Sequence, residues 1–167
     1  LGEMPDAQFL EPRGRFKTKL SRTGLFLEGK SASTFISWSH VAHCAVIPAH
    51  QSTKKEGEDI MVIHLCPDQV QFNGKPLKNV LWNMQKAVGK PISMTNKNEV
   101  PPSGPFLHES SLITGLVEHA WGSQVTRPRP DLFTTVAAKD SKPFLRCYKG
   151  TQEGAIYPLA CGVVFIK

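Results

Sequence analysis

Short apolar runs separated by turn residues make up most of this chain, and they constrain the fold more than any other feature. The runs are rich in β-branched and aromatic side chains, and glycine, proline or an Asn73-Gly74 pair interrupts them. Runs of this kind predict β-strands joined by tight turns, and Asn-Gly is a strong hairpin signal. We predict strands at 13–20, 24–28, 33–38, 41–47, 60–65, 70–72, 77–84 and 91–94.

Only one segment shows a helical period. The period is set by five apolar residues: Leu112, Ile113, Leu116, Val117 and Ala120. This spacing predicts an amphipathic helix over 109–121, with Ser110 or Ser111 as its N-cap and Gly122 at its end. A turn-rich segment, 96–105, precedes the helix. The expected fold class is therefore mostly β with one main helix.

The composition is that of a chain with a real core. It has 167 residues, of which 40% are hydrophobic, enough for one domain or somewhat more. No run of about 18 apolar residues occurs. The first residues also lack the basic-then-apolar order of a signal peptide. We expect a soluble intracellular protein with no membrane partner.

Positive charge gathers near the start of the chain. The net charge is +6, which favours polyanionic partners. Arg13, Arg15, Lys17 and Lys19 stand at alternate positions, so in a strand they share one face, and we name these four residues the basic stripe. Arg22 and Lys30 extend the predicted DNA- or anion-binding site.

An alternating cationic strand is also what the solvated face of an antiparallel sheet looks like, so the structural interpretation stays open beside the binding one. No aromatic residues alternate with the cations on that face, as a platform for single-stranded nucleic acid would require. The stripe therefore favours the backbone of a duplex or another anionic surface.

No catalytic or metal site is predicted. Zinc accepts the donors that His40, His43, Cys44, His64 and Cys66 offer, but the spacing of these residues fits no established zinc motif. The four cysteines form no C-x-x-C pair, so we expect free thiols. No G-x-S-x-G elbow, glycine-rich phosphate loop or carboxylate pair occurs, so we expect neither an enzyme nor a cofactor.

Both ends of the chain carry motifs of one known family. The motifs, in chain order, are Pro12-Arg13-Gly14-Arg15-Phe16, Gly29-Lys30, the segment 41–48, Cys147-Tyr148-Lys149, Glu153-Gly154 and Tyr157-Pro158-Leu159. Together they resemble the middle region of the structure-specific recognition protein family, which supplies the small subunit of the FACT histone-chaperone complex. The loop at 51–59 has no counterpart in that resemblance, and the family's acidic segment and high-mobility-group box do not occur in these residues.

The resemblance implies a fold and a function. The fold would be a pleckstrin-homology (PH)-like antiparallel barrel closed by a C-terminal helix, over 8–126. A connector at 127–142 would lead to the first hairpin of a second PH-like unit at 143–167. The implied function is that of a nuclear, chromatin-associated histone-chaperone module in transcription, DNA replication and DNA repair. Its implied partners are core histones, with DNA and a larger FACT subunit as further candidates.

Two other classes of function remain open. PH-like barrels also bind phosphoinositides through cations near their first strands, a role open to Lys17, Lys19, Arg22 and Lys30. They also dock peptides by strand addition, as a scaffold would. Trp38, Trp82 and Trp121 are predicted to lie in the core rather than at a binding surface.

Overall fold

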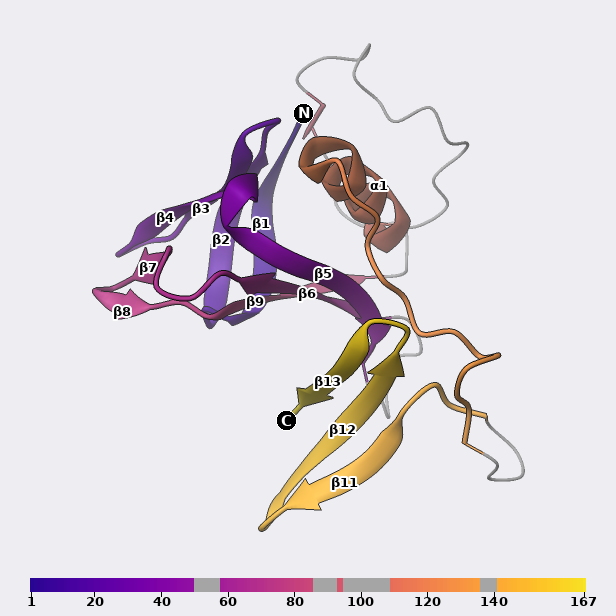
Figure 1. Cartoon of the computed structure of the whole chain (residues 1–167). Helices are drawn as coiled ribbons and strands as arrows, with labels where there is room; N and C mark the ends of the chain where they lie inside the picture. The colour runs from indigo at the N-terminus through magenta and orange to yellow at the C-terminus, as the bar shows by residue number, and fades with distance from the viewer. Residues whose placement is uncertain (50–57, 86–92, 95–108, 136–140) are drawn as a thin grey trace.

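The chain forms a curled antiparallel sheet, one helix and a separate three-stranded sheet (Figure 1). This arrangement is a computed structural model that describes residues 1–49, 58–85, 93–94, 109–135 and 141–167. The predicted loop at 51–59 lies outside these residues as far as residue 57, and so does the whole of the predicted turn segment 96–105. The expectation of a mostly β chain with one main helix is confirmed.

The main sheet follows the order β4-β3-β2-β1-β9-β6-β5, and β10 also pairs with β1. Its strands are β1 (Gly2–Glu11), β2 (Gly14–Leu20), β3 (Gly24–Glu28), β4 (Ser33–Ser37), β5 (Val41–Pro48), β6 (Glu58–Leu65), β9 (Asn79–Gln85) and β10 (Ser93–Met94). The 3-10 turn η1 (Trp38–His40) leads from β4 into β5. Strands β7 (Gln71–Phe72) and β8 (Lys75–Pro76) form a small hairpin around Asn73-Gly74. The positive φ angles of that pair, 52° and 71°, are those of the predicted tight turn.

Strand β1 was not predicted, although it pairs with both β2 and β9 and so joins the two halves of the sheet. Met4, Ala7 and Phe9 are buried, but the register of β1 against β2 shifts between Met4 and Ala7. The irregularity at Pro5 and Asp6 breaks the alternation of apolar and polar residues by which strands are recognised. The bulge therefore explains why the sequence pattern does not predict this strand.

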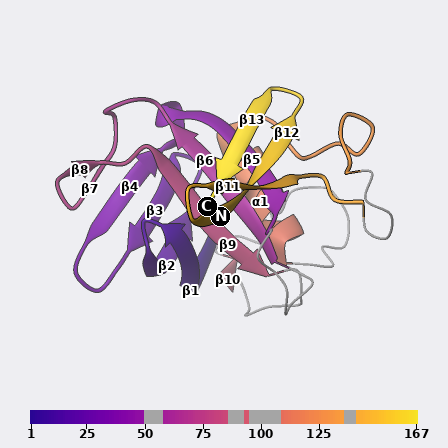
Figure 2. The ribbon, with the colours of Figure 1, turned by 90° about the horizontal axis from the view of Figure 1, so that it is seen from below.

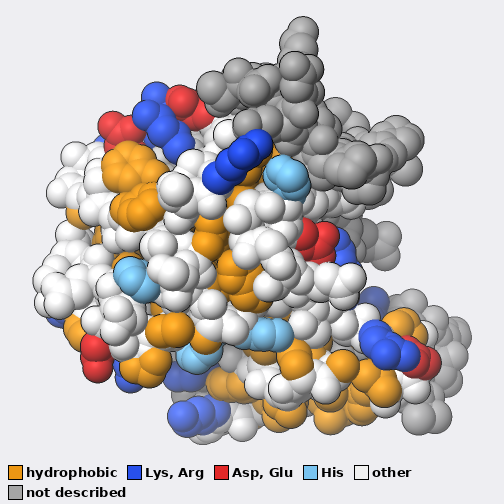
Figure 3. All heavy atoms as spheres, turned by 45° about the horizontal axis from the view of Figure 1, so that its top comes forward, with side chains coloured by type: hydrophobic (Ala, Val, Ile, Leu, Met, Phe, Trp, Pro, Cys, Tyr) orange, Lys and Arg blue, Asp and Glu red, His pale blue; other side chains and the backbone are white. Residues whose placement is uncertain are grey.

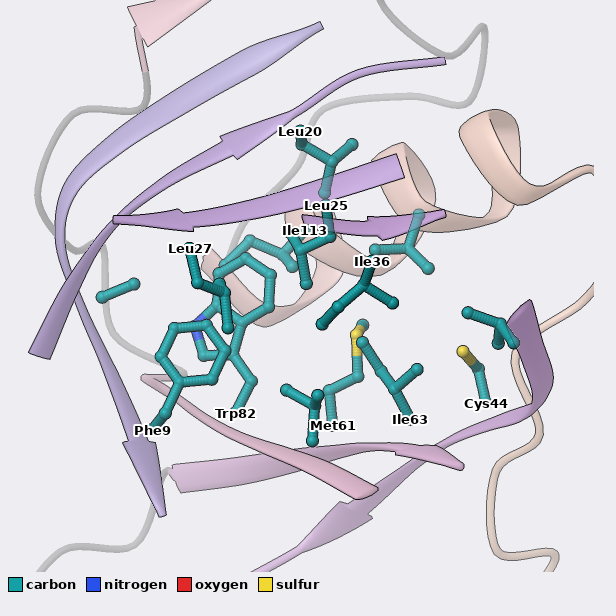
Figure 4. Packing of buried hydrophobic residues seen from close by; sticks show 14 of the residues in the cluster. Phe9, Leu20, Leu25, Leu27, Ile36, Cys44, Met61, Ile63, Trp82 and Ile113 are labelled. Atoms are coloured by element: carbon teal, nitrogen blue, oxygen red, sulfur yellow. The ribbon is translucent and has the colours of Figure 1, made fainter. Parts of the chain in front are cut away.

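A single apolar core fills the inner face of the main sheet (Figure 4). Phe9 and Trp82 stack with ring centroids 5.1 Å apart. The helix α1 (Glu109–Trp121) places Ile113 and Leu116 in the same cluster. Trp38 and Trp82 are buried as predicted, and Trp121 packs half-buried against the cluster.

The predicted bounds of the helix are confirmed, but its predicted N-cap is wrong. Ser110 and Ser111 lie inside the first turn, where Ser110 is buried and its carbonyl oxygen accepts a 2.6 Å hydrogen bond from Thr114 Oγ1. Gly122, at φ +76°, ends the helix as predicted. In the part of the chain that the structure describes, no helix has the length and apolarity to span a membrane.

The C-terminal segment forms two hairpins, where the sequence predicted one. Its strands are β11 (Leu145–Lys149), β12 (Gln152–Leu159) and β13 (Gly162–Ile166), in that order across the sheet. One face of this sheet packs on the outer face of β5 and β6 (Figure 2). This second core contains Ala45, Ile47, Ile60, Val62, Phe144, Ala155, Tyr157, Leu159 and Ile166. Strands β5 and β6 are thus covered on both faces, which explains their near-continuous apolar sequences.

The hydrogen bond from the Tyr157 hydroxyl to the carbonyl oxygen of Pro48, 2.6 Å long, joins the two sheets. We predict that Tyr157→Phe lowers the free energy of unfolding by about 1 kcal/mol, because the Pro48 carbonyl loses its buried partner. Tyr148→Phe is the matched control, since Tyr148 is 72% exposed. Chemical denaturation of both variants checks this, and equal stabilities would contradict the role given to the bond.

Cys44 points into the main core, where burial raises the pKa of its thiol to about 12 (Figure 4). The folded protein therefore keeps this thiol neutral at alkaline pH, whereas the unfolded chain ionises it near 9.0. The resulting stabilisation is fully present below the unfolded value and is lost as the pH rises towards the folded one. We predict that a thiol reagent labels Cys44 only as fast as the chain unfolds, as measured by mass spectrometry across a denaturant series. Rapid labelling in the native state would contradict this burial.

Candidate anion-binding site

The alternation predicted for the basic stripe is present in β2. Phe16, Thr18 and Leu20 are buried against the core, and the intervening cations point to the outer face of the sheet. Arg13 lies just before the strand, in the turn from β1, and is exposed. Gly14 follows it at φ +153°, a conformation that side chains rarely adopt. The stripe is therefore a continuous surface feature.

A cleft of about 790 Å³ opens at the beginning of the stripe, between the β1–β2 turn and the β3–β4 turn. The β3–β4 turn is closed by a 2.9 Å hydrogen bond from the Gly29 amide to the carbonyl oxygen of Ala32. A Cβ atom on Gly29 would lie 2.8 Å from that oxygen and 2.9 Å from the Phe16 ring, so only glycine fits there. Because Gly29 packs so closely against Phe16 of β2, the next residue, Lys30, lies beside the basic stripe.

The structure brings together four of the six predicted cations and leaves two outside the cleft. Arg13, Arg15, Lys17 and Lys30 line it, together with the carboxylates of Asp6 and Glu28. Lys19 continues the stripe on the outer face of β2. Arg22 lies in the β2–β3 turn, at the opposite end of the strand. The cleft therefore concentrates positive charge, although acidic side chains offset part of it.

Two cations of the stripe are ion-paired to strand β1. Arg15 Nη1 lies 2.6 Å from Asp6 Oδ2, and Lys17 Nζ lies 2.6 Å from Glu3 Oε1. The hydrogen bond from Lys17 lowers the pKa of Glu3, and the same bond raises the pKa of Lys17. Both pairs are partly exposed, and exposed pairs exchange partners at little cost in free energy. An incoming phosphate can therefore replace either carboxylate.

Sequence reasoning missed the two carboxylates because it missed β1. Their positions follow from the pairing of β1 with β2, in which Glu3 lies opposite Lys19 and Gln8 lies opposite Arg15. On the face shown in Figure 3, acidic side chains likewise lie beside several of the basic ones. The positive charge on the surface is thus interrupted by carboxylates, although the net charge of the chain is +6.

Three of the five residues of the candidate zinc site, His43, Cys44 and His64, are divided between the two faces of the main sheet. His43 lies opposite His64 across β5 and β6, on the outer side. The neighbouring Cys44 is buried on the inner side. Among the residues that the structure describes, no group of three or more histidine, cysteine or acidic side chains could hold a metal ion.

No protein-family model and no curated protein matches this chain.

The carboxylates of β1 compete with external anions for Arg15 and Lys17, which gives a test of the site. We predict that Glu3→Gln combined with Asp6→Asn raises the affinity for duplex DNA several-fold. The salt dependence of log K should stay close to that of the native chain, since Arg15 and Lys17 contact phosphates in both proteins. Fluorescence anisotropy across a salt series measures both quantities.

The matched control removes the same charge elsewhere, with Asp68→Asn and Glu153→Gln. Both residues are exposed and neither lines the cleft. If the control variant gains as much affinity as the β1 variant, net charge explains the effect and the cleft has no special role.

Proposed function

We propose that this chain is a non-enzymatic histone-chaperone module of a FACT-like complex, which binds core histones and the backbone of DNA. The observation that carries the proposal is where the family-like motifs lie. The Pro12-to-Phe16 motif forms the turn that begins the basic stripe. The Tyr157-Pro158-Leu159 motif supplies two buried contacts between the sheets. One motif therefore contributes to the basic surface proposed to bind DNA, and the other contributes to the packing between the two sheets.

The proposed architecture is a PH-like barrel followed by the beginning of a second PH-like unit. The curled antiparallel sheet with α1 supports the first part, which takes in all of β1 and so begins before residue 8. The three-stranded sheet supports the second part. Strand β13 of this sheet leaves Val163 68% exposed and Phe165 41% exposed. The proposed connector is 127–142.

The basic stripe suits a polyanion better than a small anion. From Arg13 to Lys19 an extended chain covers about 20 Å, enough to follow several successive phosphates. Arg15 and Lys17 would exchange their carboxylate partners for phosphate oxygens, and Lys30 would add a contact from the β3–β4 turn. Binding of this type weakens as the salt concentration rises, because it releases counterions. Histones are themselves basic, so the proposed contact with them uses a different surface.

A phosphoinositide-binding adaptor is the second candidate function. The observation in its favour is the convergence of Arg13, Lys17 and Lys30 at one cleft, which could take a phosphorylated headgroup. Strand addition to a sheet edge, as in a peptide-binding scaffold, is the third. A nuclear, chromatin-associated location belongs to the first proposal and not to these two.

Titrating the chain with core-histone complexes and, separately, with short duplex DNA tests the proposal. We predict saturable histone binding in the micromolar range or tighter, and DNA binding that falls at least about tenfold when the four stripe residues are replaced by serine. The matched control replaces four exposed lysines elsewhere, Lys75, Lys78, Lys142 and Lys149. Circular dichroism confirms that both variants are folded.

The outcomes separate the candidate functions. Unchanged DNA affinity and salt dependence in the stripe variant would contradict the stripe as the DNA contact. Binding of DNA without histones would reduce the proposal to a nucleic-acid adaptor. Sedimentation with phosphoinositide vesicles, in the absence of histone binding, would favour the adaptor at membranes.

A further inference from the structure

A second cleft, of about 650 Å³, lies between the outer face of the main sheet and strand β13, and it shares no residue with the basic cleft. Apolar side chains form much of its wall, among them Val62, Leu81 and Val163. At this cleft the Cys161 Sγ lies 3.0 Å from His43 Nε2, although the two residues are 118 positions apart in the chain. A thiol and an imidazole in contact beside an apolar cleft form a chemical arrangement that the proposed function does not use.

A β-bulge places His43 on the outer face. The register of β5 against β6 shifts between Val41 and His43. Val41 and Cys44 are both buried in the main core, so two consecutive residues between them, Ala42 and His43, are left outside it. Regular alternation would have turned His43 inward with Val41. Bulges re-aim side chains in this way beside functional sites.

The turn from β12 to β13 places Cys161. Leu159 pairs with Gly162, so Ala160 and Cys161 form the tip of a tight hairpin, and Gly162 takes φ +155°. The thiol also lies 3.6 Å from Thr126 Oγ1. Thr126 is fixed by backbone hydrogen bonds to β5, from its amide to the Cys44 carbonyl and from the Val46 amide to its own carbonyl. Cys161 is therefore held by both sheets, yet it remains exposed.

The contact offers the thiol a proton acceptor in the tautomer of His43 whose Nε2 carries no hydrogen. The nucleophilic form of cysteine is the thiolate, and a neighbouring histidine favours it by taking the proton. The other titratable side chains that line the cleft are Glu11, His64 and Lys167, and the Nδ1 of His64 lies 2.8 Å from Asn79 Oδ1. Cys44 differs, since it is buried and faces the main core.

We propose that Cys161 is a reactive thiol, with His43 as its proton acceptor, which forms covalent adducts with α,β-unsaturated carbonyl compounds that carry an apolar group. In the addition, the Cys161 sulfur bonds to the β-carbon and the C=C bond becomes a single bond. The thiol proton passes to His43 and then to the α-carbon, so there is no leaving group and no oxidant is required. The apolar group lies along Val62, Leu81 and Val163.

The test measures how fast each cysteine of the whole chain reacts with N-methylmaleimide, by peptide mass spectrometry. We expect Cys161 to react about tenfold faster than the half-buried Cys147, and to lose that advantage in His43→Gln, because glutamine cannot take the proton of the attacking thiol. His119→Gln is the control, since His119 is exposed on α1 and lines neither cleft. It should leave the rate at Cys161 unchanged.

The apolar part of the proposal has its own readout. N-hexylmaleimide should react faster than N-methylmaleimide at Cys161 but not at Cys147, and Val163→Asn should abolish the difference. Unlabelled Cys44 in every variant shows that the core is intact. A Cys161 rate no higher than that of Cys147, or an equal rate in His43→Gln, would overturn the proposal. Equal rates for the two maleimides at Cys161 would overturn its apolar part.

Discussion

The pairing of β5 with β6 is the interaction on which the rest of the structure depends. The two strands run in register from Val41 opposite Leu65 to Pro48 opposite Asp59, apart from the bulge. Their inner faces supply the main core with residues such as Val46 and Met61, and their outer faces supply the second core. Each buried isoleucine or valine contributes about 1.5–3 kcal/mol when fully removed from water. Loss of this ladder would therefore weaken both cores at once.

The β5–β6 pair lines one cleft directly and is connected to the other through the rest of the main sheet. The main sheet runs outward from β6 through β9 and β1 to β2, which carries the basic stripe. On the other side the three-stranded sheet rests on Ala45, Ile47 and Ile60, and this contact brings Cys161 to His43. The two clefts share no residue, and only the second has residues of β5 and β6 in its wall.

Much of this fold could be predicted from local pattern. Strand β3 and helix α1 have the predicted bounds, because a short apolar run and a helical period are each complete within their own segment. Strand β1 could not be found in this way, since its bulge interrupts the alternation. The second C-terminal hairpin was missed for a related reason. Its tip, Ala160-Cys161, has no residue that marks a turn until Gly162 follows.

The candidate sites show the same difference between features set within one segment and features set by long-range packing. The outward direction of Lys17 and Lys19 follows from alternation within one strand, and so it was predicted correctly. The carboxylates opposite them, and the contact between Cys161 and His43, depend on which segments become neighbours. Sequence distance conceals such pairs, because the register and packing that create them are properties of the whole sheet.

The ion pairs on the stripe bear on which anions it can hold. Glu3 and Asp6 already satisfy Lys17 and Arg15, so a single phosphate gains little by replacing one exposed carboxylate. A polyanion replaces both and also reaches Arg13 and Lys30, while it releases the counterions condensed along its length. Under the proposed function, the acidic residues of β1 therefore make the stripe selective among anions. They favour long, densely charged partners over isolated anions, and they let those partners dissociate as salt rises.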